Sequence, residues 1–266
     1  MEEFQHQLFT VLGALICFHI LVKCILFLKY IFPHTWNALP QAFFRSQGEW
    51  AVVTGAGDGL GKAYCFELAK RGLNIVMISR TLEKLQRAAA EIEQATGQQV
   101  KIIQADFTKD SVYENIEESL EGLEIGVLVN NVGMLHNPLP CRFLNGPDVD
   151  EVGLFCVQLR LTRDRFCLIL NLSSGLGTFP CPLYTMYSAS KVGFHIVVAP
   201  FGVSTPMTMH QKPSLITKMP EEFVNESLDY VTFGDEIFGC LAHEILVIEF
   251  DSLQMDPKNR TKTNWQ

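Results

Sequence analysis

Residues 50–61 read WAVVTGAGDGLG, and this short stretch indicates the fold of the chain. Its first five residues are mainly apolar or β-branched, a pattern typical of a strand buried on both faces of a parallel sheet. Gly55, Gly59 and Gly61 follow, and a helix-like segment begins at Lys62. Glycine lets the backbone turn tightly and approach a pyrophosphate, which binds at the N-terminus of the helix. Because the turn lies between a strand and a helix, the stretch predicts a dinucleotide-binding site.

The alternation of strand and helix continues along the chain. We expect strands at 50–54, 73–79, 100–107, 125–131, 166–174 and 195–200, and helices at 62–71, 81–96, 110–120, 220–231 and 235–250. This pattern predicts an α/β fold with a Rossmann-like doubly wound parallel sheet. Ligands bind such a sheet at the carboxyl ends of its strands, where Asp106 and Asn131 fall. Either residue taken singly is also a common turn former.

The residue that follows the second strand indicates which nicotinamide cofactor the site takes. About 20 residues beyond the glycine turn, an acidic side chain would bind the ribose 2′-hydroxyl of NAD, whereas an arginine accommodates the 2′-phosphate of NADP. The chain has Ser79 and Arg80 there, with no acid beside them. We therefore expect NADP(H) as the cofactor; the simpler interpretation is that Arg80 merely begins the next helix.

A second stretch, SGLGTFPCPLYTMYSASK at 174–191, contains the candidate catalytic residues. Tyr187 and Lys191 are four residues apart, so a helix would place them on one face. A free tyrosine has a pKa of about 10, and a nearby ammonium would lower it toward neutral pH. The hydroxyl of Ser174, which ends the predicted strand 166–174, would donate to a substrate oxygen. Alone, the Tyr-x-x-x-Lys pair is also typical of an ordinary helix surface.

Composition excludes several other classes of function. The chain has 266 residues and a formal charge of -8, from 21 Lys and Arg against 29 Asp and Glu. It has no basic stripe, so we expect no nucleic-acid partner. The eight cysteines are scattered and form no Cys-x-x-Cys or zinc-like spacing, which predicts no metal site and a reducing compartment.

The N-terminus carries an almost wholly apolar run at 8–28. Its 21 residues would span roughly the 30 Å hydrocarbon layer as a helix, which predicts a membrane anchor. Alternatives are a signal peptide, which would be shorter and begin with positive charge, and a helix lying in the membrane interface. Positive residues follow the run (Lys29 and Arg45), and this bias predicts that the downstream domain faces the cytosol.

Taken together, these motifs resemble the short-chain dehydrogenase/reductase family. The matches are Thr-Gly-x-x-x-Gly-x-Gly at 54–61, Asn-Asn-x-Gly at 130–133, Ser174, Tyr-x-x-x-Lys at 187–191 and Pro-x-Gly-Val-x-Thr at 200–205. They occur in the family's order over 50–205. The hydrophobic N-terminus and the segment after the glycine turn resemble the microsomal 17β-hydroxysteroid dehydrogenase branch of this family.

The resemblance implies a role for each matched residue. It assigns Gly55, Gly59 and Gly61 to the pyrophosphate, Ser79 and Arg80 to the 2′-phosphate, Asp106 to the adenine, and Asn131, Val203 and Thr205 to the nicotinamide side. Lys191 would hold the nicotinamide ribose and lower the pKa of Tyr187. Tyr187 would then give the proton, while Ser174 orients the oxygen, in NADPH-dependent reduction of a 17-ketosteroid of the androstenedione-to-testosterone type.

The resemblance also implies a domain plan and a location. It divides the chain into an anchor at 1–32, a linker at 33–49, the NADP-binding domain at 50–205, lid helices over the substrate at 206–250 and a loose tail at 251–266. The implied partners are a steroid or another lipophilic ketone, the endoplasmic reticulum membrane with the catalytic domain in the cytosol, and a second subunit in a homodimer. A short helix after Tyr187 would weaken that dimer.

Two departures from the family pattern keep alternatives open. The family carries a further catalytic asparagine on the helix after Asn-Asn-x-Gly, but this chain has no asparagine between Asn145 and Asn171. The helix that should begin at Tyr187 is also cut short, because Gly193 and the predicted strand at 195–200 follow it closely. The domain therefore reads as incomplete around 150–165 and 192–200. One alternative is a splice-type or gene-model variant that binds nucleotide or a partner without turnover. The other is a 3-ketoacyl-CoA reductase, because that relative shares the layout.

Overall fold

The computed structural model describes residues 2–31, 39–40, 42–109, 112–133, 168–178, 183–184, 187–188, 191, 197–232 and 236–247. The chain forms two compact units, Met1–Leu39 and Pro40–Gln266. Predictions for 134–165, 192–196 and the tail 251–266 lie outside the described residues.

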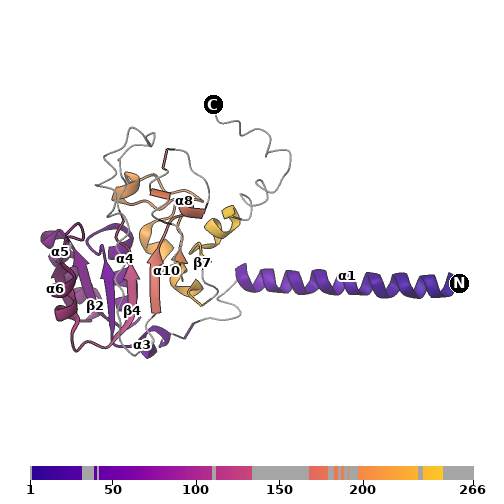
Figure 1. The fold of residues 1–266 in the computed structure, drawn as a ribbon, viewed down its shortest axis with the longest axis horizontal. Helices are drawn as coiled ribbons and strands as arrows, with labels where there is room; N and C mark the ends of the chain where they lie inside the picture. The colour runs from indigo at the N-terminus through magenta and orange to yellow at the C-terminus, as the bar shows by residue number, and fades with distance from the viewer. Residues whose placement is uncertain are drawn as a thin grey trace. The chain divides into compact units, whose positions relative to one another are not determined.

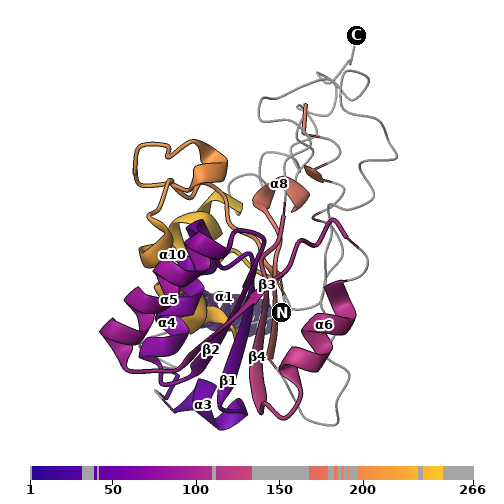
Figure 2. The same ribbon diagram turned by 90° about the vertical axis from the view of Figure 1, so that its left-hand side faces the viewer.

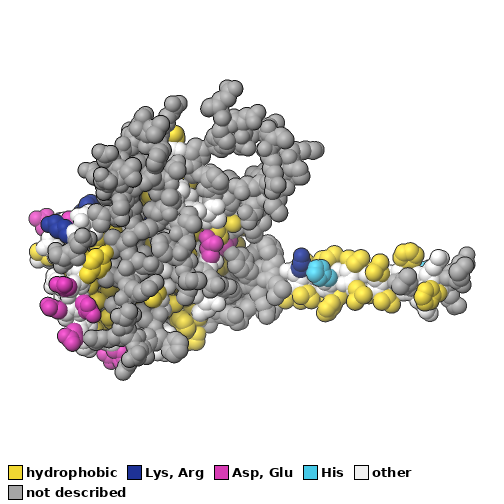
Figure 3. Space-filling view, viewed as in Figure 1, with side chains coloured by type: hydrophobic (Ala, Val, Ile, Leu, Met, Phe, Trp, Pro, Cys, Tyr) yellow, Lys and Arg dark blue, Asp and Glu magenta, His cyan; other side chains and the backbone are white. Residues whose placement is uncertain are grey.

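The first unit contains one long helix, α1 (Glu2–Ile31). Within it, Phe4–Ile25 is long and apolar enough to cross a membrane, and none of its most apolar part is buried against the protein. Apolar side chains line α1 in the space-filling view (Figure 3). Such an exposed apolar helix is unfavourable in water. α1 is therefore a candidate membrane anchor, as the apolar run at 8–28 predicts.

The second unit is built on a seven-stranded sheet in the order β3-β2-β1-β4-β5-β6-β7 (Figure 1). The strands are β1 (Trp50–Thr54), β2 (Asn74–Ser79), β3 (Val100–Gln104), β4 (Ile125–Asn130), β5 (Leu168–Leu172), β6 (Val197–Val198) and β7 (Glu236–Ile237). All neighbouring strands pair in parallel. The predicted doubly wound parallel sheet is confirmed.

Helices cover both faces of this sheet. The described helices of this unit are α3 (Phe43–Gln47), α4 (Gly59–Lys70), α5 (Leu82–Thr96), α6 (Val112–Leu120), α8 (Gly175–Thr178), α10 (Pro220–Tyr230) and a helix at 241–247, with a 3-10 turn η2 (Pro206–Thr208). Not all of them lie on a face of the sheet. Helices α4, α5 and α10 lie on one face and α6 lies on the other (Figure 2). Acidic side chains are visible on the part of the surface that α5 and α6 form (Figure 3).

The centre of the sheet positions the candidate site. Strand β1 pairs with β2 on one side and with β4 on the other, so Val53 lies beside both Met77 and Val129. These three side chains are fully buried. The strand order reverses between β1 and β4, and the loops at their carboxyl ends diverge there to leave a crevice for a ligand.

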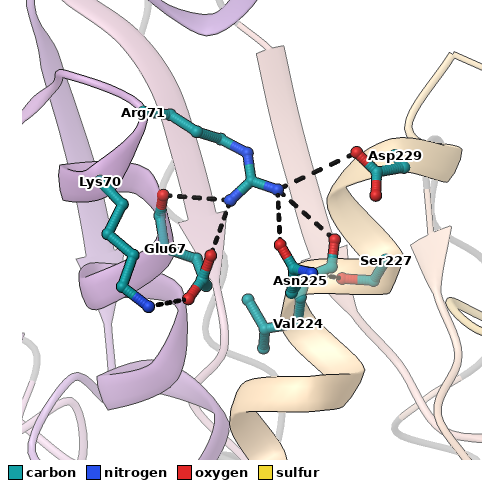
Figure 4. Close-up of polar contacts among 7 residues, drawn as sticks. All are labelled: Glu67, Lys70, Arg71, Val224, Asn225, Ser227 and Asp229. Carbon is teal, nitrogen blue, oxygen red and sulfur yellow. Dashed lines mark hydrogen bonds and ion pairs between the residues drawn. The ribbon is translucent and has the colours of Figure 1, made fainter. Parts of the chain in front are cut away.

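Helix α4 is joined to α10 by polar contacts at its C-terminal end (Figure 4). The Arg71 guanidinium donates to the Glu67 carboxylate over 2.9 Å and to the Asn225 side-chain oxygen over 3.1 Å. Further along α4, the Tyr64 and Ser227 hydroxyls share a buried hydrogen bond of 2.9 Å. These bonds fix α4, whose first turn begins at the glycine-rich loop.

The predicted strands and helices are present with ends shifted by up to three residues, except near residue 236, and the short α8 is not predicted. The predicted sixth strand at 195–200 is present as the short β6, parallel to β5. Helix α5 ends at Gly97, which adopts a left-handed φ of 71° as a C-cap does. The prediction of one continuous helix from 235 to 250 is wrong, because residues 236–237 form β7 and the described helix begins at 241. The left-handed Gly239 (φ 81°) separates the two elements.

The segment interpreted as a linker contains a helix. Phe43–Gln47 forms α3, and Phe44 is buried at 2% exposure. The Arg71 guanidinium carbon lies 5.7 Å from the centre of the Phe44 ring. This part of 33–49 therefore packs on the second unit.

Candidate active site

A cavity of about 290 Å³ opens at the carboxyl ends of the central strands. Eight of the predicted site residues line it: Gly55, Gly59, Ser79, Arg80, Asp106, Asn131, Lys191 and Thr205. They come from segments up to 150 residues apart in the chain, so the sheet gathers them into one site. Gly61, Val203, Ser174 and Tyr187 are not among the residues that line this cavity.

The glycine turn lines the end of the cavity where a phosphate group could bind. Gly55 and Gly59 have left-handed φ angles of 64° and 55°, which side chains other than glycine rarely adopt. The first hydrogen bond of α4 runs from the Lys62 N–H to the Asp58 carbonyl. The N–H groups of the first turn have no partner within the helix, and they carry the positive end of its dipole. This end of the cavity can therefore bind an anion.

Gly61 has a packing role rather than a lining role. A Cβ atom at this position would lie 2.2 Å from the Gly55 carbonyl oxygen and 2.6 Å from the Asn131 side-chain nitrogen. Only glycine allows α4 to approach the turn this closely. The contact explains the spacing between Gly55 and Gly61 that the sequence shows.

Asn131 holds the same turn from the end of β4. Its side-chain amide donates to the Thr54 carbonyl (3.1 Å) and to the Gly55 carbonyl (3.2 Å), and its backbone N–H donates to the Thr54 hydroxyl (3.0 Å). Asn131 lines the cavity, but its amide N–H groups shape the turn. The buried Asn130 amide donates to Asn171 across to β5 over 2.9 Å.

The end of β2 places Ser79 and Arg80 at the rim. Arg80 is exposed, and its carbonyl accepts a hydrogen bond of 3.0 Å from the Gln104 side chain. The residue that follows β2 is Arg80 and not an acid. An exposed guanidinium at the end of the second strand suits a phosphate monoester on the ribose.

Asp106 lies after β3 on the same rim. Its Oδ1 accepts the Thr108 backbone N–H (3.2 Å) and the Thr108 hydroxyl (2.9 Å). These hydrogen bonds lower the pKa of the Asp106 carboxyl, with smaller contributions from the Lys109 and Arg80 charges. The carboxylate therefore stays ionised at neutral pH and caps its own turn.

Sequence reasoning missed an ion pair in this cavity, Asp58–Lys84. The Lys84 ammonium lies 2.6 Å from Asp58 Oδ2, and both residues line the cavity beside Arg80. Asp58 stands between Gly57 and Gly59 of the glycine turn, and Lys84 lies in the first turn of α5. No local signal in the sequence links the two residues, because the pair depends on how α5 packs against the glycine turn.

Ser174, Tyr187 and Lys191 come together at the end of β5. All three are buried, at 8%, 8% and 7% exposure. The Ser174 hydroxyl is hydrogen-bonded to the Tyr187 hydroxyl. The Lys191 ammonium lies 5.7 Å from the centre of the Tyr187 ring and donates to the Leu172 carbonyl over 3.0 Å. The Ser173 hydroxyl donates to the Lys191 carbonyl.

The expected lowering of the Tyr187 pKa is not what the structure shows. Burial of the phenol raises the pKa of Tyr187, and the hydrogen bond with Ser174 offsets only part of that rise. The reason is desolvation, which disfavours the phenolate. Tyr187 therefore remains protonated at neutral pH in this arrangement.

The last predicted residues, Val203 and Thr205, lie after β6. Val203 is buried, and its backbone pairs with that of Lys218. Thr205 lines the cavity and begins η2, where its backbone N–H donates to the Thr208 hydroxyl over 2.9 Å. The Thr208 hydroxyl also donates to the Val203 carbonyl over 2.6 Å. These bonds hold the loop as one side of the cavity.

Comparison with known proteins agrees with this geometry. Residues 49–202 match the family described as short chain dehydrogenase. The chain is 51% identical to 17-beta-hydroxysteroid dehydrogenase type 3 of Homo sapiens, over 92% of this chain and 88% of that protein. It is 41% identical to very-long-chain 3-oxoacyl-CoA reductase of Anas platyrhynchos, over 75% of this chain and 74% of that protein.

A solved structure also shares the fold. It is a short-chain dehydrogenase from Sphingobium yanoikuyae in complex with NADPH, with a TM-score of 0.57 and 19% identity. The similarity covers 82% of this chain and 98% of that one.

Proposed function

This chain belongs to the short-chain dehydrogenase family of oxidoreductases, and on that premise we propose that it reduces a 17-ketosteroid with NADPH. The observation that carries the proposal is the buried Ser174–Tyr187 hydrogen bond beside Lys191, next to a cavity that begins at the glycine turn. The identity to 17-beta-hydroxysteroid dehydrogenase type 3 supports the substrate class.

The residues around the cavity fit NADP(H). Gly55 and Gly59 leave the N-terminal N–H groups of α4 accessible for a pyrophosphate. Arg80 stands where the 2′-phosphate of NADP is recognised, and the similar fold from Sphingobium yanoikuyae was solved with NADPH. When bound, this cofactor supplies the hydride. We assign Ser79 to the same phosphate, Asp106 to the adenine side and Thr205 to the nicotinamide side.

Tyr187 is the proposed acid of the reaction. Reduction of a ketone to an alcohol consumes one proton at the oxygen. The Tyr187 phenol is protonated at neutral pH and so carries the proton that the reaction consumes. Burial raises its pKa and makes it a weaker acid, so donation needs a nearby positive charge that favours the phenolate. The Ser174 hydroxyl, bonded to the same phenol, is placed to orient the substrate oxygen. Lys191, with its ammonium 5.7 Å from the phenol ring, favours the phenolate that forms.

We propose that α1 anchors the enzyme in the endoplasmic reticulum membrane with the second unit in the cytosol. A candidate span at Phe4–Ile25, followed by positive residues, supports this orientation. A membrane location also suits a lipophilic ketone, which partitions into lipid. The segment 206–250, with α10 and the helix at 241–247, is the proposed lid over the substrate.

A form without turnover is the second candidate. The Lys191 ammonium donates back to the Leu172 carbonyl, and the chain has no asparagine between Asn145 and Asn171 to hold a proton-relay water. Such a form would bind nucleotide and leave the ketone unreduced. A 3-ketoacyl-CoA reductase is the third candidate, supported by the 41% identity to the avian 3-oxoacyl-CoA reductase.

One pair of measurements separates these functions. Full-length protein in detergent is assayed for NADPH oxidation with androstenedione and with a 3-ketoacyl-CoA, and in parallel for thermal stabilisation by NADPH. The proposal expects stabilisation and turnover of the steroid, with turnover reduced at least about 10²-fold in Tyr187→Phe. Stabilisation without turnover of either substrate supports the second candidate, and turnover of the thioester alone supports the third.

A further inference from the structure

The rim of the cavity carries two cations and two carboxylates close to the end of β2. Arg80 and Lys84 are the cations, and Asp58 and Asp106 are the carboxylates. We infer that Lys84, held by Asp58, is a second cation of the 2′-phosphate subsite and contributes to discrimination between NADPH and NADH. The inference rests on the proposed function and adds a specificity-determining residue to it.

The ion pair bridges the two elements that would enclose the 2′-phosphate. Asp58 belongs to the glycine turn after β1, and Lys84 belongs to the first turn of α5, which follows β2. Their charged atoms are 2.6 Å apart. Both side chains are about half exposed, at 48% and 53%, so a ligand in the cavity can reach them.

The Lys84 side chain lies against the glycine turn. A Cβ atom at Gly57 would lie 3.4 Å from Lys84 Cβ and 3.4 Å from the Ser79 hydroxyl, which is ordinary van der Waals contact. Lys84 and Ser79 are therefore both neighbours of the turn. This contact and the Asp58 bond limit the rotamers of a long side chain that is otherwise costly to order.

The charges around the cavity favour a second cation beside Arg80 for binding a 2′-phosphate. Lys109 and Arg80 both act on the Asp106 carboxylate, whereas Asp58 is paired with Lys84. Without Lys84, the Asp58 carboxylate would lose this cation and would repel a phosphate dianion in the cavity. An ammonium has three N–H donors, so the bond to Asp58 leaves donors for a phosphate oxygen.

Two small probes isolate the 2′-phosphate from the rest of the cofactor. We would measure by calorimetry the binding of 2′,5′-ADP and of 5′-AMP to the full-length protein in detergent. The ratio of their affinities reports the contribution of the 2′-phosphate alone. The variants are Lys84→Met and the conservative Lys84→Arg.

Lys62→Met is the matched control. The Lys62–Glu91 pair has the same 2.6 Å length and also reaches α5, but neither residue lines the cavity. We expect wild type to prefer 2′,5′-ADP and Lys84→Met to lower that preference about ten-fold, as the loss of one charge-assisted bond predicts. Affinity for 5′-AMP should not change. Lys84→Arg should retain most of the preference, and Lys62→Met all of it.

The outcomes distinguish failure of the inference from failure of the proposed function. If wild type prefers 2′,5′-ADP and Lys84→Met keeps that preference, Lys84 is not part of the subsite, while the NADPH assignment stands. An equal loss of both probes in Lys84→Met would also overturn the inference, since the effect would not be on the 2′-phosphate. If wild type shows no preference, the NADPH assignment fails and the inference fails with it.

Discussion

Replacing Arg71 by methionine tests the polar network that joins α4 to α10. The guanidinium is only 17% exposed and lies between the Glu67 carboxylate at 2.9 Å and the Asn225 side chain at 3.1 Å. It also approaches Asp229 at 3.9 Å. In Arg71→Met the Glu67 carboxylate, itself 9% exposed, would keep only its bond to Lys70 among these partners. Methionine would also remove the guanidinium from the Phe44 ring, whose centre lies 5.7 Å from the guanidinium carbon.

The magnitude follows from the burial of Glu67. Removing one partner of a buried ion pair costs about 3–5 kcal/mol, because the other charge stays buried without compensation. Lys70 remains 2.6 Å from Glu67 but is 58% exposed, so it offsets part of this loss. We therefore expect a loss of about 2–3 kcal/mol in the free energy of unfolding. For a domain of this size, the midpoint of thermal unfolding should fall by about 5–10 °C.

The assay is thermal unfolding of full-length protein in detergent, followed by circular dichroism. Lys62→Met is the control, because the Lys62–Glu91 pair is equally short but 32% and 45% exposed, and its loss should cost at most about 1 kcal/mol. Adding Glu67→Gln to Arg71→Met should recover part of the stability by removing the uncompensated charge. Equal shifts for Arg71→Met and Lys62→Met would refute the reasoning, as would a double variant less stable than Arg71→Met.

Three further predictions concern the site and its loop. Gly61→Ala should weaken NADPH binding at least about ten-fold, because the new Cβ would lie 2.2 Å from the Gly55 carbonyl; unchanged affinity by calorimetry would contradict this. Arg80→Gln should raise the KM for NADPH about ten-fold or more and leave that for NADH nearly unchanged, and parallel increases in both values would contradict the assignment. Burial lowers the pKa of His243, whose Nδ1 accepts the Phe201 N–H. Its contribution to stability is therefore full above about pH 6.5 and is lost as the pH falls through the lower folded pKa; urea midpoints across this range should show that loss in wild type and less of it in His243→Asn.

The sequence predicts the strands β1 to β5 and the part of the site that would bind the nucleotide. Long, continuous apolar runs and a glycine turn between strand and helix are local signals. They predict β1 through β5, the turn at Gly55 and the basic residue at the end of β2. Each of these features depends on residues that are adjacent in the chain, so the periodicity and spacing of the sequence are enough to predict it.

The remaining features depend on packing between distant segments. Strand β7 has two residues and is followed by the left-handed Gly239, so the apolar run from 235 resembles one helix. The Asp58–Lys84 pair depends on how α5 is rotated against the glycine turn. The direction of the Tyr187 pKa depends on burial, which Tyr-x-x-x-Lys spacing does not encode.

The bond between Tyr64 and Ser227 has a consequence for how the chain folds as it is synthesised. The two hydroxyls are 163 residues apart in sequence. The ribosome therefore completes β1, α4 and the glycine turn long before α10 exists to cover the Tyr64 face of α4. Until then that apolar face is a binding surface for chaperones, and closing so large a loop is slow. Nucleotide bound at the other end of α4 would stabilise the helix during this interval, so added NADPH should raise the yield of folded protein in cell-free synthesis.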